Sequence, residues 1–320
     1  MKKKFLFILF LLVFLSGSLF TYLKAQEEKP LLHFVQISDT HLQSMIAPDG
    51  ERLLKSSEEL LTTLVNQINE IKDLDFVLST GDNVDQTKEE LVNKYIEVTM
   101  SLKYPLHVLF GNHDVGVNVA LNKKEYIKKF AGSTSFTKDM SYYSFSPNEK
   151  FTFICLDGTT EKIITANGQI EEEEQWKWLK EELEQNKDKF IIIAQHFPLI
   201  EPFKSKSHFF LEPDRTKLLE LVNSYKNVIG VFTGHYHAAR LFKIENRIHN
   251  SNPAIIQHPC AFREITITQE KPKYLLVDFK WHEVKKPELR EKSKANSKSW
   301  RVSEGAVEDR EQVIKWKIYK

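Results

Sequence analysis

Short apolar runs alternate with segments of helical periodicity along most of this 320-residue chain. Continuous apolar runs typical of buried strands occupy residues 31–37, 76–78, 108–110, 151–156, 190–194 and 228–232. Between them, helical spacing or helix-favouring composition predicts helices at 53–71, 88–100, 171–185 and 215–225. Four consecutive glutamates at 171–174 suit a helix N-terminus. The alternation predicts an α/β domain with buried, largely parallel strands.

The pattern changes after residue 246. Consecutive strands are predicted at 254–256, 264–268 and 274–279, and we expect them to extend a second sheet. Residues 283–299 are rich in Lys, Glu and Ser without an apolar period, which favours a solvated loop; a basic binding patch is the alternative. Because the sequence has no internal repeat and no clear boundary, residues 26–320 are expected to form a single domain.

The first residues have a different character. Three lysines follow Met1, and residues 5–20 are almost wholly apolar. This pattern is typical of an export signal with a cleavage site after Ala25, and residues 5–23 are also nearly long enough for an uncleaved membrane anchor. Both alternatives keep the lysines on the cytoplasmic side. Residues 1–25 therefore predict a body that is secreted or anchored on the outer face of the cytoplasmic membrane.

Composition and charge indicate a folded domain with a sizeable core and exclude few classes of function. An apolar content of 41% supports a sizeable core, and a net charge of +1 gives no bulk attraction to nucleic acid. Only two cysteines are present, Cys155 and Cys260, which excludes a disulfide framework. Their apolar surroundings leave open one bridge or two buried free thiols.

Chemistry-bearing residues follow five of the predicted strands. The sequence reads SDTH at 38–41, TGDNVD at 80–85, GNHD at 111–114, QHFP at 195–198 and TGHYH at 233–237. Since the carboxyl ends of strands form the ligand crevice of an α/β sheet, we expect five loops to meet at one edge of one sheet. The candidate metal ligands in these loops are Asp39, His41, Asp82, Asn112, His196, His235 and His237.

The candidate donors predict a pair of metal ions. Seven oxygen and nitrogen ligands exceed the needs of one ion and suit two ions that share a carboxylate. Mixed imidazole and carboxylate donors favour Mn, Fe or Zn over Ca or Mg, and the lack of a nearby cysteine argues against a structural zinc site. Gly81, Gly111 and Gly234 are expected to let the backbone turn sharply beneath a crowded site.

The same residues resemble the signature of the calcineurin-like metallophosphoesterase family. The blocks, in the family order over residues 39–237, are Asp39-x-His41, Gly81-Asp82-x-x-Asp85, Gly111-Asn112-His113-Asp114, a lone His196 and Gly234-His235-x-His237. The chain is similar to the class III cyclic-nucleotide phosphodiesterase branch, but Gln195 stands where that branch commonly has a histidine. The resemblance implies a four-layer sandwich of two mixed β-sheets flanked by helices, in agreement with the alternation above.

The resemblance also implies a role for each motif residue. Asp39, His41 and His237 would hold one ion. Asn112, His196 and His235 would hold the other, and Asp82 would bridge the two together with a water or hydroxide. His113 would donate a proton beside the phosphate, with Asp85 orienting its ring. Asp114 is expected to bond the nearby backbone instead of taking part in catalysis.

The predicted function is an exported hydrolase of phosphomonoesters or phosphodiesters, in which a metal-bridging hydroxide attacks phosphorus in line. A non-catalytic metal-bound interaction protein and a lipid- or nucleotide-directed phosphodiesterase are the alternatives. The expected partner is the phosphoester substrate, with no nucleic acid; the oligomeric state stays open.

Two histidines outside the motifs, His208 and His258, have two interpretations. They either line the entrance of the substrate site or have a purely structural role. Arg263 likewise suits a phosphate clamp or a surface ion pair.

Overall fold

The computed structural model describes residues 29–43, 48–115, 121–136, 139–161, 165–204 and 208–319. The predicted leader at 1–25 lies outside these residues. Leu31–Lys320 forms one compact unit. Over the described ranges, no helix combines the length and apolar character that a bilayer crossing requires.

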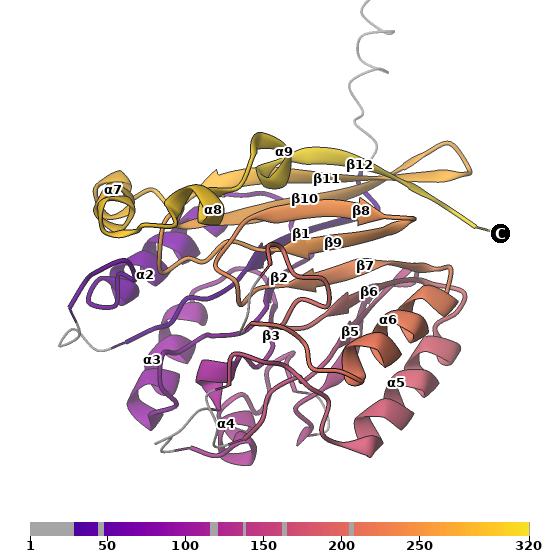
Figure 1. Ribbon diagram of the computed structural model, residues 1–320, viewed down its shortest axis with the longest axis horizontal. Coiled ribbons are helices and arrows are strands. Elements are labelled where there is room, and N and C mark those ends of the chain that lie inside the picture. The colour runs from indigo at the N-terminus through magenta and orange to yellow at the C-terminus, as the bar shows by residue number, and fades with distance from the viewer. Residues whose placement is uncertain are drawn as a thin grey trace, which may run out of the picture. The chain divides into compact units, whose positions relative to one another are not determined.

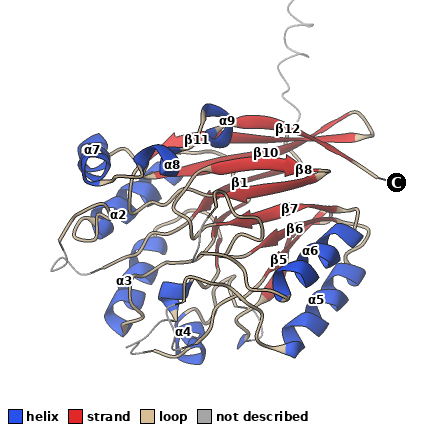
Figure 2. Ribbon diagram, viewed as in Figure 1, coloured by secondary structure: helices blue, strands red, loops and turns tan. Residues whose placement is uncertain are grey.

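Twelve strands of the described chain form two six-stranded sheets (Figures 1 and 2). The first sheet has the order β12 (Gln312–Lys317), β11 (Tyr274–Glu283), β10 (Ala261–Glu270), β1 (Leu32–Ile37), β2 (Phe76–Ser79), β3 (Leu106–Val108). The second has the order β4 (Tyr143–Asn148), β5 (Phe151–Cys155), β6 (Phe190–Ala194), β7 (Val228–Thr233), β9 (Arg247–Ser251), β8 (Arg240–Ile244). Both sheets are mixed.

Parallel pairing joins β1, β2 and β3 at one side of the first sheet and the four central strands of the second. In the first sheet β1 pairs parallel to β2, with Val35 opposite Val77, and antiparallel to β10, with Val35 opposite Glu264. In the second sheet β5, β6, β7 and β9 are parallel neighbours. The expectation that β10 and β11 extend a second sheet is therefore wrong, because they extend the sheet of β1. The prediction of a strand at 254–256 is also wrong, since this buried segment is an irregular connection.

Helices cover the outer face of each sheet. One apolar core joins the inner faces of both sheets with α2 (Ser57–Ile68) and α3 (Glu89–Thr99). A second core packs α5 (Glu173–Gln185) and α6 (Asp214–Ser224) against β5, β6 and β7. Aromatic rings bridge the two sheets, with the Phe34 and Phe153 centroids 5.3 Å apart. The predicted four-layer sandwich of two mixed sheets flanked by helices is confirmed (Figure 2).

The C-terminal region departs most from expectation. The predicted solvated loop at 283–299 is wrong, because it contains α7 (Pro287–Asn296), which begins with Pro287 at its first position. Two short helices, α8 (Trp300–Glu304) and α9 (Val307–Arg310), then lead into β12. A helix was not expected because the side chain that α7 buries is a serine, Ser293, so it shows no apolar period. The remaining short helix, α4 (Lys123–Lys129), follows the GNHD segment.

Candidate metal centre

The five motif loops meet at one place, but they come from two sheets. The loops after β1, β2 and β3 belong to the first sheet, and the loops after β6 and β7 belong to the second. The prediction of a single sheet edge is therefore wrong. The carboxyl ends of parallel strands in both sheets deliver the candidate ligands to a shared site.

One group of potential ligands combines Asp39, His41, Asp82 and His237, each with a donor atom within 4.8 Å of the others. His237 Nε2 lies 3.2 Å from Asp39 Oδ1. His41 Nε2 lies 3.3 Å from Asp82 Oδ2 and 3.1 Å from His237 Nε2. All four residues are buried, so their donor atoms face one another away from bulk water.

A second group combines Asp82 with His196 and His235. His196 Nε2 is 3.3 Å from Asp82 Oδ2, and His235 Nδ1 is 3.2 Å from His196 Nε2. Asn112 joins this group, because its Oδ1 lies 3.2 Å from His196 Nε2. The structure therefore brings together all seven predicted ligands in two groups that share Asp82.

This arrangement fits two divalent cations. Ring nitrogens of His41 and His237 face each other at 3.1 Å, and those of His196 and His235 do so at 3.2 Å. Carboxylate oxygens of Asp39 and Asp82 converge on the same space. Buried lone pairs that face one another are costly, and a cation held between them removes that cost.

The outward-facing nitrogens of three histidines are held by oxygen acceptors. His196 Nδ1 lies 2.8 Å from Thr80 O, His235 Nε2 lies 2.8 Å from Ala166 O, and His237 Nδ1 lies 2.8 Å from Gln257 Oε1. A ring that donates its N–H outward keeps a lone pair on the nitrogen that faces the site. Sequence reasoning missed Gln257 and Ala166 because neither stands in a recognisable motif.

Backbone strain is concentrated at the candidate ligands. Positive φ angles are found at Asp39 (54°), His41 (39°), Asp82 (52°), His235 (71°) and His237 (51°). Non-glycine residues rarely adopt this region, and each such residue costs on the order of 1–3 kcal/mol. The surrounding hydrogen bonds and packing hold a conformation that turns these side chains inward.

The glycines of the motifs serve two different purposes. Gly81 has a φ of +95°, as expected for a sharp turn. Gly111 is extended, with a φ of −108°, and its importance is close approach: a Cβ there would lie 2.2 Å from Asp82 Oδ1. A Cβ on Gly234 would similarly lie 1.9 Å from Ser38 Oγ. The expectation of sharp turns is therefore correct for Gly81 only.

Asp114 supports the loops from beneath the site. It is fully buried in a 3₁₀ turn, Asn112–Asp114, and both of its carboxylate oxygens accept hydrogen bonds. The donors are the backbone N–H groups of Gly111, Asn83 and Val84 and the side-chain amide of Asn83, at 2.9–3.2 Å. The expectation that Asp114 bonds nearby backbone is confirmed.

Burial and opposite charges set the protonation of the cluster. Burial opposes ionisation of Asp39, but His237 and His196 lower the pKa of this carboxyl to about 2. Burial lowers the pKa of His41 to about 4 and the pKa of His235 well below its usual value. Burial likewise opposes charge on His196, yet Asp82 raises its pKa to about 9. Ionised Asp39 and neutral His41 and His235 are thus in the states that bind metal, whereas His196 must lose a proton when an ion binds.

His113 forms a third potential ligand group with His41 and Asp85, beside the two groups that share Asp82. Its backbone N–H donates to Asp82 Oδ1 at 2.8 Å. Its Nδ1 lies 3.1 Å from the backbone carbonyl oxygen of Asp85 and 3.6 Å from the Asp85 carboxylate, which is also 3.3 Å from His41 Nδ1. Asp85 therefore contacts the His113 ring, as the resemblance implies, and its backbone carbonyl is a nearer partner than its carboxylate.

A cavity of about 220 Å³ opens onto the cluster. Its lining consists of Arg52, Asp82, Asn112, His113, Ala166, His208, His235 and His237. His208 thus lies where the substrate-mouth interpretation would place it, whereas His258 is paired with Glu304. Arg263 is fully buried and donates to Asn250 and to the carbonyls of Ser251 and Asp309, so both interpretations of this residue are wrong.

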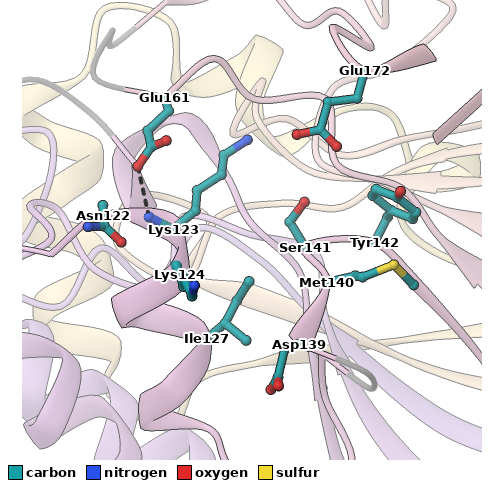
Figure 3. A pocket seen from close by; sticks show the side chains of 10 residues that line it. All are labelled: Asn122, Lys123, Lys124, Ile127, Asp139, Met140, Ser141, Tyr142, Glu161 and Glu172. Atoms are coloured by element: carbon teal, nitrogen blue, oxygen red, sulfur yellow. Dashed lines mark hydrogen bonds between the residues drawn. The ribbon is translucent and has the colours of Figure 1, made fainter. Parts of the chain in front are cut away.

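A larger hollow, of about 610 Å³, lies beside α4 (Figure 3). Its wall combines Ile127, Met140 and Tyr142 with charged side chains, and the backbone N–H of Lys123 donates to Glu161 there. None of the potential metal-ligand groups of the described chain contributes to this hollow. The two cysteines, Cys155 and Cys260, are buried and unbridged.

Comparison with known proteins agrees with the geometry. The model of the calcineurin-like phosphoesterase family matches residues 32–239. A probable glycerophosphodiester phosphodiesterase of Arcobacter nitrofigilis is 26% identical over 63% of this chain and 71% of its own length. A probable cyclic nucleotide phosphodiesterase of Fibrobacter succinogenes is 23% identical over 70% of this chain and 80% of its own length.

A solved structure shares the fold. The dimetal phosphatase of Danio rerio superimposes with a TM-score of 0.57 at 16% identity, over 78% of this chain and 96% of the other. The family match covers all five motif blocks and the two groups of clustered donors. The chain is thus a metal-dependent hydrolase that belongs to the calcineurin-like phosphoesterase family.

Proposed function

We propose that this chain is an exported hydrolase of phosphomonoesters or phosphodiesters that works with two divalent ions of Mn, Fe or Zn. One observation carries the proposal. Asp82 Oδ2 lies 3.3 Å from His41 Nε2 in one ligand group and 3.3 Å from His196 Nε2 in the other. A single carboxylate oxygen that faces both groups suits a ligand shared by neighbouring ions.

In this proposal Asp39, His41 and His237 would hold one ion, Asn112, His196 and His235 would hold the other, and Asp82 would be available to both. When bound, the ions offset the negative charge of the phosphoryl group and lower the pKa of an attacking water. The strained loops and buried hydrogen bonds hold the donor atoms in place before substrate arrives.

His113 and Asn112 act on the substrate itself. The bond between His113 Nδ1 and the Asp85 carbonyl fixes the ring, and the His113 side chain lines the cavity. A protonated His113 can pass a proton from Nε2 to the departing oxygen, and the Asp85 carboxylate 3.6 Å from Nδ1 stabilises its positive charge. The Asn112 amide nitrogen can donate to a phosphoryl oxygen while its Oδ1 faces His196.

The direct test is hydrolysis of bis-p-nitrophenyl phosphate and p-nitrophenyl phosphate by the Mn-loaded protein. Asp82→Ala and His235→Ala are expected to lower activity at least about 100-fold, because they remove donors to the ions. His282→Ala, on β11, is the control and should retain activity. Unchanged activity in both site variants would refute the proposal. A protein that binds less than one ion per chain and turns over no substrate would indicate a non-catalytic interaction protein.

His113→Ala separates proton donation from metal binding. We expect kcat to fall about 10²- to 10⁴-fold while the metal content stays the same, because His113 is a proton donor here and not a ligand. The measurement combines steady-state kinetics with metal analysis of the same preparation. Loss of an ion in His113→Ala would show that the residue has been given the wrong role.

Export is part of the proposal and is supported by the basic start and apolar run of residues 1–25. Expression of the tagged chain followed by cell fractionation and mass measurement tests it. A secreted body shortened near Ala25 would support a signal peptide, and a full-length chain in the membrane fraction would support an anchor. A full-length chain in the cytosol would contradict export.

A further inference from the structure

Arg52 is a cationic side chain at the mouth of the metal cavity. It lines this cavity together with His113 and His208, and its side chain is 39% exposed. Its Nη1 lies 3.8 Å from Asp85 Oδ1, which is too long for a strong hydrogen bond. The guanidinium therefore retains donors that can face a ligand in the cavity.

The backbone of Arg52 is tied to a segment that supports the metal ligands. Arg52 forms an isolated antiparallel bridge with Gln257, and the N–H of Leu53 donates to Ile256 O at 2.7 Å. Gln257 is the residue whose Oε1 holds His237 Nδ1 at 2.8 Å. The position of Arg52 is thus set by the same segment that orients one candidate ligand.

Helix α7 is hydrogen-bonded to the residues next to both Arg52 and Gln257. The Ser293 hydroxyl is fully buried, donates to Glu51 O at 2.5 Å and accepts from the N–H of His258 at 2.7 Å. The Ser297 hydroxyl donates to the Glu51 carboxylate at 2.6 Å. One helix therefore holds both the segment that carries Arg52 and the segment that carries Gln257.

We propose that Arg52 binds a phosphate oxygen of the substrate and selects phosphoesters with more than one negative charge. The inference rests on the proposed function and adds to it a residue and a substrate class. A guanidinium matches phosphate with two parallel N–H donors, and it attracts a second negative charge that the ions leave uncompensated. The cavity of about 220 Å³ brings this donor close to any phosphoryl group at the cluster.

The second negative charge of the substrate can come from either of two chemical groups. A phosphomonoester carries it on the reacting phosphoryl group, and a diphosphate carries it on the adjacent phosphate. A simple diester has only one charge. Three probes separate these cases: p-nitrophenyl phosphate as the monoester, ADP-ribose as the diphosphate and bis-p-nitrophenyl phosphate as the singly charged diester.

The experiment compares kcat/KM of the wild type, Arg52→Ala and Arg52→Lys for the three probes. Arg52→Ala is expected to lower the value about tenfold for a doubly charged probe and less than about threefold for the diester. Arg52→Lys should recover part of the loss, since lysine restores the positive charge but not the two parallel N–H donors of the guanidinium. Arg215→Ala is the matched control, because Arg215 on α6 is 35% exposed and paired with Glu212. Whichever doubly charged probe shows the selective loss identifies the source of the charge.

A binding measurement keeps this inference separate from the proposed hydrolysis. Calorimetric titration of the Mn-loaded protein with inorganic phosphate should give a Kd about tenfold weaker for Arg52→Ala than for the wild type. An equal loss of kcat/KM on all three probes, or an unchanged phosphate affinity, would overturn the assignment. If the wild type turns over none of the probes, the proposed function fails, and the phosphate titration still decides whether Arg52 binds phosphate.

Discussion

At the scale of single residues, hydrogen bonds to other polar atoms leave Asp82, His196, His235 and His237 each with one donor atom aimed at the site. Asp82 shows this most clearly, because Oδ1 accepts from His113 N–H and Oδ2 is left facing His41 and His196. All seven candidate ligands could be identified from sequence, because Asp, His and Asn stand in ordered motifs at strand ends. Gln257 could not be found in this way, because it stands in no motif and contacts His237, which lies 20 residues away in the sequence.

Replacement of Gln257 by leucine is expected to weaken metal binding about 10- to 100-fold. The substitution removes the acceptor that keeps the His237 N–H turned outward, so the ring loses its fixed orientation. Titration of the apo protein with Mn²⁺ measures the effect. Gln67→Leu is the matched control, since Gln67 is equally buried and hydrogen-bonded to a distant carbonyl, Glu283 O. Equal metal affinity in Gln257→Leu and wild type would contradict this role.

Asp114→Asn is expected to lower the free energy of unfolding by about 2–3 kcal/mol. Both carboxylate oxygens of Asp114 accept N–H groups, so an asparagine amide nitrogen must face at least one donor. Burial and the nearby Asp82 carboxylate raise the pKa of Asp114 to about 7, so urea denaturation at about pH 9, where the carboxylate is ionised, measures the change. A variant as stable as the wild type would show that Asp114 is protonated in the native protein or that the turn tolerates repacking.

At the scale of the elements, the strands and helices with apolar periodicity could be predicted, and those with polar buried faces could not. The four long helices of the sandwich agree with the sequence to within a few residues at each end. Helix α7 was missed because it contributes one leucine, Leu289, to the apolar core and otherwise buries the hydroxyl of Ser293, so it has no apolar stripe. Sheet membership was mispredicted for β10 and β11 because antiparallel pairing to β1 leaves no mark in local periodicity.

Ser293→Ala tests whether α7 anchors the body through this hydroxyl. The substitution leaves Glu51 O and the N–H of His258 without their shared partner, so the free energy of unfolding should fall by about 1–3 kcal/mol. Thermal or urea denaturation provides the measurement. Ser224→Ala is the control, because the Ser224 hydroxyl bonds only within its own helix region, to Leu221 O, at the surface. Similar losses in both variants would argue against an anchoring role.

We expect Glu264, on β10 of the first sheet, to make a pH-dependent contribution to the free energy of unfolding. Hydrogen bonds from His282 and His33 hold the pKa of Glu264 well below its usual value. A depressed carboxyl pKa stabilises the fold above the unfolded pKa of about 4.3 and loses this effect as the pH falls. Glu264→Gln should therefore cost about 1 kcal/mol at pH 7, and the difference from wild type should shrink below about pH 4.

Urea denaturation across the pH range checks the Glu264 prediction. Glu181→Gln, at an exposed position on α5, serves as the control and should show little difference at any pH. A Glu264→Gln deficit that stays constant down to acidic pH would mean that the lost interaction does not depend on the carboxylate charge.

At the scale of the whole molecule, the site exists only because two sheets meet. Three motif loops come from one sheet and two from the other, so neither half holds a complete ligand set. The family match ends at residue 239. The chain after it supplies Gln257, which contacts His237, and α7, whose Ser293 bonds the backbone of Glu51. Sequence motifs could indicate the reaction, but the supporting shell depends on contacts between distant segments.

The most direct measurement of the central claim is the metal content of the Mn-loaded protein, determined by elemental analysis of wild type and Asp82→Ala. We expect two ions per wild-type chain and a marked loss in Asp82→Ala, because one Asp82 oxygen faces both ligand groups. One ion or fewer in the wild type, or two ions retained in Asp82→Ala, would contradict a shared dinuclear site.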